Sequence, residues 1–476
     1  MKKMILIAAL LAVSLVSKAQ LVGTGITKSF HRLSFNLFNE ILKTEEGNVC
    51  FSPQSVQFAL SMLLSGAGGN TMEQMRKVMG IEDYVSNEEI HLFNLSRINA
   101  LTRRPPFLKD EWTWCSDDEE VMREHYEASY PLCEIANALW TRPDISVKEP
   151  FTRTLRYDYL AGMGPVRFDT QKGIDEVNAW VDEHTHGLIP QIFSQPQSSD
   201  LALVLANSIY LKAAWAVPFI KELTKKEPFY LEDGSEVQVD MMNVSSRQFY
   251  VSETGKFKCV TIPYANHFYM TVLVPAEGTE LPEITCDDWH LALEAFNNDE
   301  VKLSEKGINL KMPKFEIEGN YDLRTPLKNL GMTDAFSPSL CDFYAISDRN
   351  LPVSAIYQLD KIMVDEEGTE AAAVTVIEAN EIIDIFDTDD FFVDRPFYFT
   401  IENMLTRSVL FLGKVVNPNG DDAGQTTHIY NIAENDDDNK TEDDRPDQIF
   451  DLNGRKLQHV PAHGLYIRNG KIFLNK

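Results

Sequence analysis

Residues 365–391 read DEEGTEAAAVTVIEANEIIDIFDTDDF, and the fold of the whole chain depends on how this stretch is used. Three acidic residues and Gly368 lead into a run of small residues, after which the stretch becomes apolar and acidic. Glutamate and alanine favour a helix, which Thr369 could cap. The β-branched residues 374–377 favour a strand instead. The residues alone leave both interpretations open.

The strand interpretation gives this stretch an unusual inner face. Side chains alternate between the two faces of a strand. One face would therefore carry only small residues: Thr369, Ala371, Ala373 and Thr375. A strand of this kind can enter between two existing strands without displacing a packed core, because it brings little side-chain volume. The stretch is suited to insertion into a sheet.

Composition and charge limit the class of protein. The 476 residues are 44% hydrophobic, which predicts one large domain with additional segments. A formal net charge of −28 argues against nucleic acids and anionic membranes as partners. The first residues carry a lysine pair, an apolar run and the small residues Ser17 and Ala19, which predict a signal peptide over residues 1–19. No later stretch is apolar enough to span a bilayer. We therefore expect a secreted protein with no membrane span.

The order of expected elements indicates the fold class. Helical periodicity covers residues 27–44, and further helices are expected after Ser52-Pro53, from Asn70, over residues 173–193 and over residues 327–336. Strands are expected at residues 134–140, 201–211, 249–275, 307–318 and 397–416. Residues 83–131 give no clear pattern and suggest an elaborated surface segment. Because helices come first and strands predominate later, the class is α+β.

The composition changes after residue 418. Residues 419–447 are strongly acidic with almost no apolar side chains, which predicts a disordered linker. Residues 448–476 alternate around Asn453-Gly454 and Asn469-Gly470, which are strong signals for β-hairpins. Hairpins of this size cannot bury a core alone, so we expect this tail to dock on something.

Cysteine and catalytic motifs give few signals. Export would permit a disulfide between Cys115 and Cys133, and free thiols are the alternative. The chain has no nucleophile elbow, zinc-binding helix or phosphate loop. His184 and His186 lie two apart, so on a helix they would face different sides. We expect no enzyme, no metal site and no cofactor.

Residues 26–418 resemble the serpin family throughout their length. The resemblance rests on blocks in the family's order, such as NVCFSPQS at 48–55 and FLGKVVNP at 411–418. The other blocks are residues 135–140, 178–181, 207–215, 312–315, 330–336, 365–373 and 395–397. It implies a serpin domain over residues 20–418 with about nine helices, three β-sheets, a five-stranded central sheet and an exposed reactive loop. Residues 448–476 resemble the C-terminal sorting modules of secreted bacterial proteins that use the type IX route.

The same resemblance implies roles for individual residues. The hinge of the reactive loop would comprise Glu366, Gly368, Thr369, Ala371, Ala372, Ala373 and Thr375. Glu366 would pair with Lys314, close to Trp215 and Thr224. A polar cluster under the central strands would comprise Ser52, Ser55, Asn207 and Gln358. The family usually has histidine where this chain has Gln358, and glutamine cannot change charge with pH.

The resemblance also implies an activity. A protease would cut the loop at Ile382-Ile383, with Glu381 and Asp384 as neighbouring alternatives for the cut, and the loop would insert and trap the acyl-enzyme. Apolar Ile382 favours elastase-like or subtilisin-like serine proteases as covalent partners of a monomer. Papain-like cysteine proteases are an alternative. The other class of function is a non-inhibitory carrier with the same fold.

Overall fold

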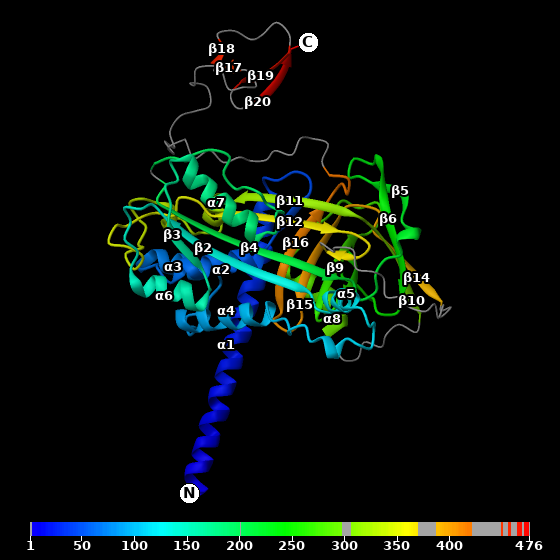
Figure 1. The fold of residues 1–476 in the computed structure, drawn as a ribbon, viewed down its shortest axis with the longest axis horizontal. Helices are drawn as coiled ribbons and strands as arrows, with labels where there is room; N and C mark the ends of the chain where they lie inside the picture. The colour runs from blue at the N-terminus through cyan, green and yellow to red at the C-terminus, as the bar shows by residue number, and fades with distance from the viewer. Residues whose placement is uncertain are drawn as a thin grey trace. The chain divides into compact units, whose positions relative to one another are not determined.

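The computed structural model describes residues 2–199, 201–297, 306–369 and 387–420, together with the backbone of short strands between 449 and 475. For residues 2–21 and 294–297 it describes only the backbone. The chain divides into two compact units, Met1–Asn431 and Ile432–Lys476. Figure 1 shows the helices and strands of the first unit, most of them labelled.

Nine α-helices lie in the described part of the first unit. They are α1 Lys2–Leu42, α2 Pro53–Leu64, α3 Gly69–Val78, α4 Asn87–Leu101, α5 Glu119–Ser129, α6 Glu149–Asp158, α7 Gln171–His184, α8 Cys286–Asn297 and α9 Arg324–Asn329, with 3-10 turns at Lys109–Glu111, Lys221–Leu223 and Asp334–Phe336. The helix expected at 327–336 is instead split, because Gly331 takes a left-handed φ of 111° and ends α9. The helix expected at 173–193 ends at His184.

The central sheet has the strand order β11-β12-β13-β4-β2-β3. Its strands are β11 Phe315–Asp322, β12 Tyr357–Val364, β13 Gly368–Thr369, β4 Leu203–Ala214, β2 Leu132–Thr141 and β3 Gly162–Pro165. The expectation of five strands is therefore corrected to six. The sixth strand, β13, has only two residues. They belong to the 365–391 stretch, and they pair with β12 on one side and with β4 on the other.

Two further sheets lie in the described part of the first unit. One has the order β1-β16-β15-β9-β8-β7, with β1 Val49–Phe51, β16 Ser408–Val415, β15 Phe397–Asn403, β9 Phe268–Pro275, β8 Phe257–Pro263 and β7 Tyr250–Glu253. The other has the order β14-β10-β6-β5, with β14 Thr388–Phe392, β10 Gly307–Pro313, β6 Glu236–Ser246 and β5 Lys225–Tyr230. Buried apolar residues from the sheets and from α1 and α2 form the core between them.

The segment that lacked a clear pattern, residues 83–131, is ordered around its own small core. Trp112, Met122 and Tyr126 pack together there, and Lys212 of β4 pairs with Glu127 of α5 at 3.7 Å. All six cysteines are free thiols, so a Cys115–Cys133 disulfide is absent. Burial raises the pKa of the Cys133 thiol to about 12. No helix among the described residues has the length and apolar character needed to cross a membrane.

Four short strands lie among the described residues of the second unit, in the order β18-β17-β19-β20. These are β17 Ile449–Phe450, β18 Lys456–Leu457, β19 Gly464–Arg468 and β20 Lys471–Asn475. β19 and β20 pair antiparallel, with Arg468 opposite Lys471. Arg468 and Lys471 are the residues on either side of Asn469-Gly470, the dipeptide that the sequence analysis identified as a hairpin signal.

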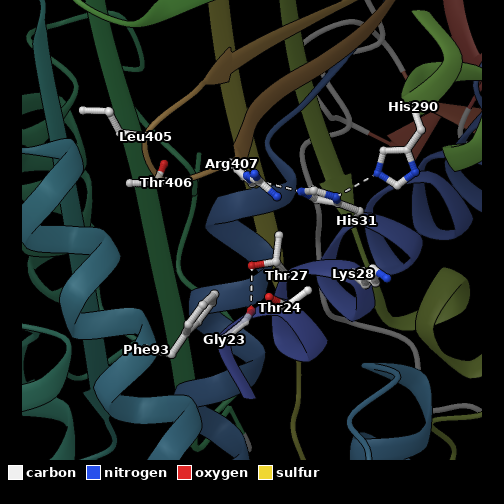
Figure 2. Close-up of a pocket in the computed structure, with 10 residues that line it drawn as sticks. All are labelled: Gly23, Thr24, Thr27, Lys28, His31, Phe93, His290, Leu405, Thr406 and Arg407. Carbon is white, nitrogen blue, oxygen red and sulfur yellow. Dashed lines mark hydrogen bonds between the residues drawn. The ribbon is translucent and has the colours of Figure 1, made fainter. Parts of the chain in front are cut away.

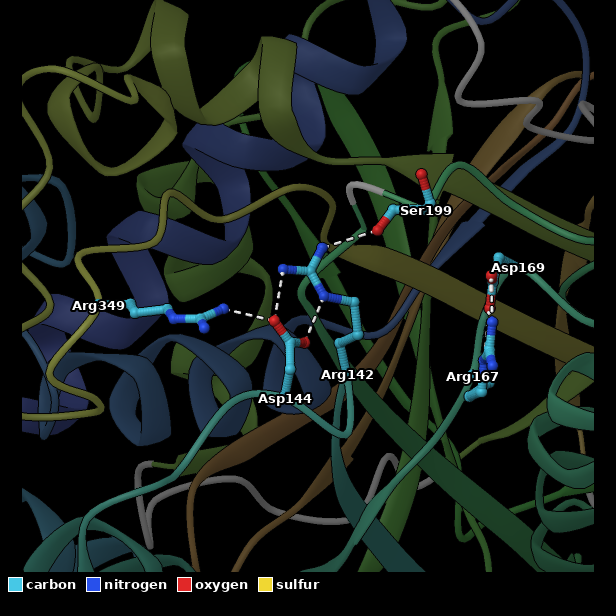
Figure 3. Close-up of polar contacts among 6 residues, drawn as sticks. All are labelled: Arg142, Asp144, Arg167, Asp169, Ser199 and Arg349. Atoms are coloured by element: carbon cyan, nitrogen blue, oxygen red, sulfur yellow. Dashed lines mark hydrogen bonds and ion pairs between the residues drawn. The ribbon is translucent and has the colours of Figure 1, made fainter.

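An exposed charged cluster lies where β2 ends and β4 begins (Figure 3). Asp144 accepts hydrogen bonds from Arg142, with Nε to Oδ1 at 2.6 Å, and from Arg349. Arg142 also donates to the carbonyl of Ser199 at 2.7 Å. The two guanidinium groups lower the pKa of Asp144 to about 2. The cluster links the β2–β4 side of the central sheet to the loop that precedes β12.

Candidate functional site

The site begins where the chain leaves β12 and turns back into the sheet as β13. The Asp365 amide donates to the carbonyl of Gly368 at 3.0 Å, and the Asp365 carboxylate accepts from the amides of Glu367 and Gly368 at 2.8 and 3.2 Å. This tight turn places Thr369 opposite both Val364 of β12 and Ala213 of β4. The first residues of the opening stretch are therefore extended and not helical.

Gly368 is required here by the close approach of two backbones. A Cβ atom at this position would lie 2.0 Å from the carbonyl oxygen of Ala213, well inside contact distance. Any side chain would push β13 away from β4. The glycine therefore allows the loop to start its turn between the two strands.

An aromatic platform holds the turn in place. Trp215, just after β4, donates from its indole nitrogen to the carbonyl of Asp365 at 2.9 Å, and from its amide to the carbonyl of Glu367 at 2.9 Å. Its ring stacks on Tyr264 with ring centroids 4.1 Å apart. The Tyr264 hydroxyl in turn hydrogen-bonds the buried hydroxyl of Thr369. Thr369 thus points into the protein and not toward solvent.

Glu366 forms a buried ion pair at the same turn. Its carboxylate lies 2.5 Å from Lys314 Nζ and accepts from the Thr224 hydroxyl at 2.7 Å, and the residue is only 4% exposed. Burial would raise the pKa of Glu366, but the bonds from Lys314 and Thr224 outweigh burial and lower it. These are the contacts that the sequence analysis expected. Glu367 pairs with Lys221 on the outside.

β4 and β12 run side by side with a seam between them. At one end β13 separates them, and at the other end Leu205 and Ile356 form a direct parallel bridge. On the two sides of the seam, β4 pairs with β2 along residues 203–212, and β12 pairs with β11 along its whole length. The sheet is therefore already parted at the hinge end and closed at the far end.

A polar cluster lies under this seam. The buried carboxylate of Asp360 accepts from the amide of Ser52 at 2.9 Å and from the side-chain amide of Gln358 at 2.8 and 2.9 Å. Ser52 caps α2, and its hydroxyl accepts from the amide of Ser55 at 3.3 Å. Burial raises the pKa of Asp360 to about 7, although the Gln358 and Ser52 hydrogen bonds oppose this. Three of the expected cluster residues thus lie around an acid that the sequence analysis missed.

Asn207 occupies the other side of the seam. Its side-chain nitrogen donates to Asn137 of β2, which donates to the carbonyl of Tyr159 at 2.8 Å. The Asn207 Oδ1 and Ser55 Oγ atoms are buried and form no hydrogen bond among the described residues. Buried polar groups are usually satisfied, so these two atoms have hydrogen-bonding capacity that the described residues do not use.

The remaining expected site residues lie outside the described residues. They are Ala371, Ala372, Ala373, Thr375, Glu381, Ile382, Ile383 and Asp384. Sequence reasoning overlooked Tyr264 and Asp360. The signal for Asp360 was present, because Gln358 and Asp360 alternate with Ile362 and Val364 on one face of β12 and must be buried with them.

A cavity of about 430 Å³ lies away from the seam, between α1, α8 and the turn that joins β15 to β16 (Figure 2). His31 contacts the carbonyl of Arg407 at 2.7 Å and His290 at 3.2 Å. Burial lowers the pKa of His31 to about 3, so its ring is neutral. Lys28 and Arg407 give the cavity a basic lining.

The comparisons with known proteins agree with this geometry. Residues 28–418 match the family described as "Serpin (serine protease inhibitor)". This chain is a serpin. The match covers the three sheets of the first unit, the turn at Glu366 and the polar cluster. The fold of the first unit is the serpin fold, and inhibition of proteases is the general activity of the family.

Individual serpins align over most of the chain. Iripin-2 of Ixodes ricinus is 30% identical over 87% of this chain and 98% of its own length. The leukocyte elastase inhibitor of Xenopus tropicalis is 30% identical over 83% of this chain and its full length. The crystal structure of human thyroxine-binding globulin with its ligand has a TM-score of 0.67 and 26% identity, over 83% of this chain and 98% of that chain. The similar proteins thus include an inhibitor and a binding protein.

Proposed function

We propose that this serpin inhibits extracellular serine proteases as a suicide substrate. A protease cuts the reactive loop, and the cut loop inserts between β4 and β12 while the protease is still bound as an acyl-enzyme. The observation that carries the proposal is β13, which lies between these two strands and starts the new strand. Ala371 to Ala373 are small, so they can follow Thr369 into the seam.

The register of β13 supports this path. Continued along the seam, it sets Thr375 opposite Asn207 and Gln358, and Ile377 opposite Leu205 and Ile356. Leu205 and Ile356 already bridge each other directly. The seam is therefore aligned as an inserted strand requires, without any slip of β4 against β12. Thr375 would bring a hydroxyl to the unpaired Oδ1 of Asn207.

The same register limits the position of the cut. Ala379 would lie opposite Leu203, the first residue of β4, so the inserted strand fills the seam by this point. A cut at Ile382-Ile383, with Glu381 or Asp384 as the neighbouring choices, leaves enough chain for full insertion. Insertion over about ten residues adds roughly twenty backbone hydrogen bonds of about 1 kcal/mol each. The backbone ordering cost of about 1–2 kcal/mol per residue offsets between half and all of this gain.

The residues around the cut favour certain proteases. Ile382 suits a shallow apolar primary pocket, as in elastase-like or subtilisin-like enzymes, and papain-like cysteine proteases are the second choice. The similarity to a leukocyte elastase inhibitor agrees with this preference. Residues 365–391 contain no lysine or arginine, so trypsin-like enzymes are poor targets.

The test is incubation of the full chain with elastase, subtilisin and papain. We expect an SDS-stable adduct with at least one serine protease and a released C-terminal fragment that begins at Ile383. Cleavage of the loop by all three without any adduct would contradict the inhibitor function. The N-terminal sequence of this fragment also identifies the peptide bond that the protease cuts.

A carrier function is the second candidate, and the basic cavity beside His31 is the observation that favours it. Thyroxine-binding globulin shows that a similar fold can hold a small ligand. A carrier would bind its ligand without loop insertion. Loop cleavage that leaves the melting temperature unchanged, together with no adduct, would favour this candidate.

The ends of the chain support export. We propose that residues 1–19 are a signal peptide, that residues 419–447 are a flexible acidic linker, and that residues 448–476 are a type IX sorting module that leads to secretion or to the cell surface. The released protein would act as a monomer. N-terminal sequencing of the secreted protein should begin at Gln20, and deletion of residues 448–476 should leave the protein inside the cell.

A further inference from the structure

Residues 102–131 form a segment between α4 and β2 that the insertion of the loop does not use. Trp114 of this segment is 70% exposed, the largest exposed fraction among the large apolar side chains of the described residues. An exposed apolar side chain by itself needs no explanation. One that is rigidly held at a surface is suited to contact another protein, because aromatic anchors are enriched where proteins meet.

The support beneath Trp114 is the small aromatic core of the segment. Trp112 is buried and meets the ring of Tyr126 edge to face, with the ring centroids 5.8 Å apart. The centroid of the Trp114 ring lies 6.1 Å from that of Trp112 and 5.9 Å from that of His125 on α5. Trp114 is thus held by rings from two parts of the segment, so it has little side-chain freedom left to lose on binding.

The segment lies at the hinge end of the central sheet. It runs into β2, whose first residue, Leu132, pairs with Lys212 of β4. Two residues further along β4, about 7 Å at the usual rise of a strand, Ala214 pairs with Gly368 at the start of the reactive loop. Glu127 of α5 also pairs with Lys212, so α5 lies beside this end of β4 (Figure 1). A protease that reaches the loop therefore approaches the end of the sheet that carries this segment.

The charges at this end have predominantly one sign. Residues 108–127 contain eight acidic residues and two basic ones, a net charge of −6 with histidine neutral. Residues 365–391 contain ten acidic residues and no basic one. β14, where the chain returns from the loop, exposes Asp389 and Asp390, of which Asp389 pairs with Lys306. Since opposite charges steer partners together, a positively charged protein face fits this end of the molecule.

Charge also excludes other occupants of the surface. The whole chain carries a formal net charge of −28, so a second copy would bring the same sign to the same place and be repelled. Nucleic acids and anionic membranes would be repelled for the same reason. A protease with basic side chains around its cleft would meet both the loop and residues 108–127 with the favourable sign.

We propose that residues 108–127 are a docking surface for the target protease, with Trp114 as the apolar anchor and the surrounding acids paired to basic side chains beside the protease cleft. This inference rests on the proposed inhibitor function and defines its partners more closely, as serine proteases with a positively charged face. Docking brings the protease to the loop before any bond is cut. It therefore raises the rate of adduct formation and does not alter how the cut loop is partitioned between trapping and release.

The test measures two quantities for the full chain and a positively charged elastase-like protease. One is the second-order rate constant of adduct formation, and the other is the dissociation constant for the same protease with its nucleophilic serine replaced by alanine. Trp114→Ala should lower the rate constant and weaken binding about tenfold each, as expected for an aromatic anchor. Asp117→Asn combined with Glu120→Gln should lower the rate constant at low salt and flatten its fall with added salt.

Tyr157→Ala is the matched control. Tyr157 is an aromatic side chain that is 64% exposed, on α6, which follows the opposite end of β2. This variant should match the parent in the rate constant and in binding. The ratio of trapped to cleaved inhibitor separates docking from a folding defect, because only a folding defect would change it. Asp117 and Glu120 are exposed, so the charge variant keeps the test decisive even if Trp114→Ala disturbs the aromatic core.

Three results separate the docking surface from the inhibitor function. Equal rate constants and equal binding for the parent, Trp114→Ala and the charge variant would overturn the docking surface and leave inhibition intact. A doubled mass in light scattering that Trp114→Ala abolishes would identify a second copy as the occupant and would also overturn the proposal. Binding of the inactive protease that depends on Trp114, without any adduct from the active enzyme, would support the docking surface and reject the inhibitor function.

Discussion

The two ends of the seam between β4 and β12 are built differently. At the hinge end, Glu366 and Lys314 form an ion pair in which the carboxylate is buried, and Trp215 and Tyr264 hold the turn. At the far end, Asp144 pairs with Arg142 and Arg349 at the surface, where the Asp144 side chain is 46% exposed. A buried pair is costly to break, and an exposed one is nearly neutral. Under the proposed mechanism, entry of the loop would therefore be controlled at the hinge, and the far end of the seam would give way when the strand arrives.

The largest expected effect comes from a charge at the hinge. In Thr369→Arg a guanidinium replaces a buried hydroxyl that bonds Tyr264, so β13 would carry an unpaired charge at the point where the inserting strand begins. The loop should still be cut, but the SDS-stable adduct should disappear. Gel analysis of cleavage and adduct measures both. Thr369→Ser, which keeps the hydroxyl, is the control, and equal adduct from Thr369→Arg and the parent would refute entry control at this position.

A smaller loss is expected from the ion pair itself. Lys314→Met leaves the buried Glu366 carboxylate without its cation and should lower the free energy of unfolding by about 2–3 kcal/mol. The value lies at the low end for buried pairs, because the Lys314 side chain reaches solvent. Urea unfolding at pH 7 measures the change. A loss of unfolding free energy no larger than that expected for a surface ion pair would show that the two ends of the seam do not differ in strength.

The sequence pointed to the turn at Glu366, Gly368 and Thr369 and to part of the cluster, while the other expected hinge residues lie outside the described residues. The motif around Gly368 identified the turn, and the pairing of Glu366 with Lys314 followed from the family resemblance. The two-residue β13 could not be predicted, because partial entry depends on the fit of Gly368 against the carbonyl of Ala213. The pattern on β12 could have revealed Asp360.

The ends of the helices could also be predicted only in part from the sequence. The start of α4 had a sequence signal that was overlooked, since Ser86 and Glu89 form a capping box. The end of α9 depends on the left-handed conformation of Gly331, and that conformation is set by packing as well as by sequence. Local signals therefore located elements well and their bounds less well.

The pH dependence of stability should come from neither end of the seam. The pKa values of Glu366 and Asp144 are lowered, so both acids remain ionised above about pH 5. Asp360 and Glu402 have pKa values raised to about 7, so the stability they contribute is fully present below about pH 4 and is lost as pH rises through 7. Glu402→Gln should raise the free energy of unfolding above that of the parent by on the order of 2 kcal/mol at pH 8, and should change it little at pH 4. Urea unfolding of the parent and of Glu402→Gln at both pH values measures this, and a difference between the two proteins that is the same at pH 8 as at pH 4 would contradict it.

The smallest effect is expected at the far end. Asp144→Asn removes an exposed pair, so the unfolding midpoint and the adduct yield should stay within experimental error of the parent. Stopped-flow measurement of adduct formation gives the rate of loop insertion, and Lys314→Met serves as the comparison. A marked rise in the insertion rate for Asp144→Asn would mean that the far end also restrains the sheet.

The central claim is that β4 and β12 are separated by the chain's own loop after cleavage. The most direct measurement is hydrogen exchange of the nicked protein along residues 203–214 and 357–364, together with its melting temperature. We predict strong new protection along both strands and a melting temperature well above that of the intact protein. Unchanged exchange in both strands and an unchanged melting temperature would contradict the account.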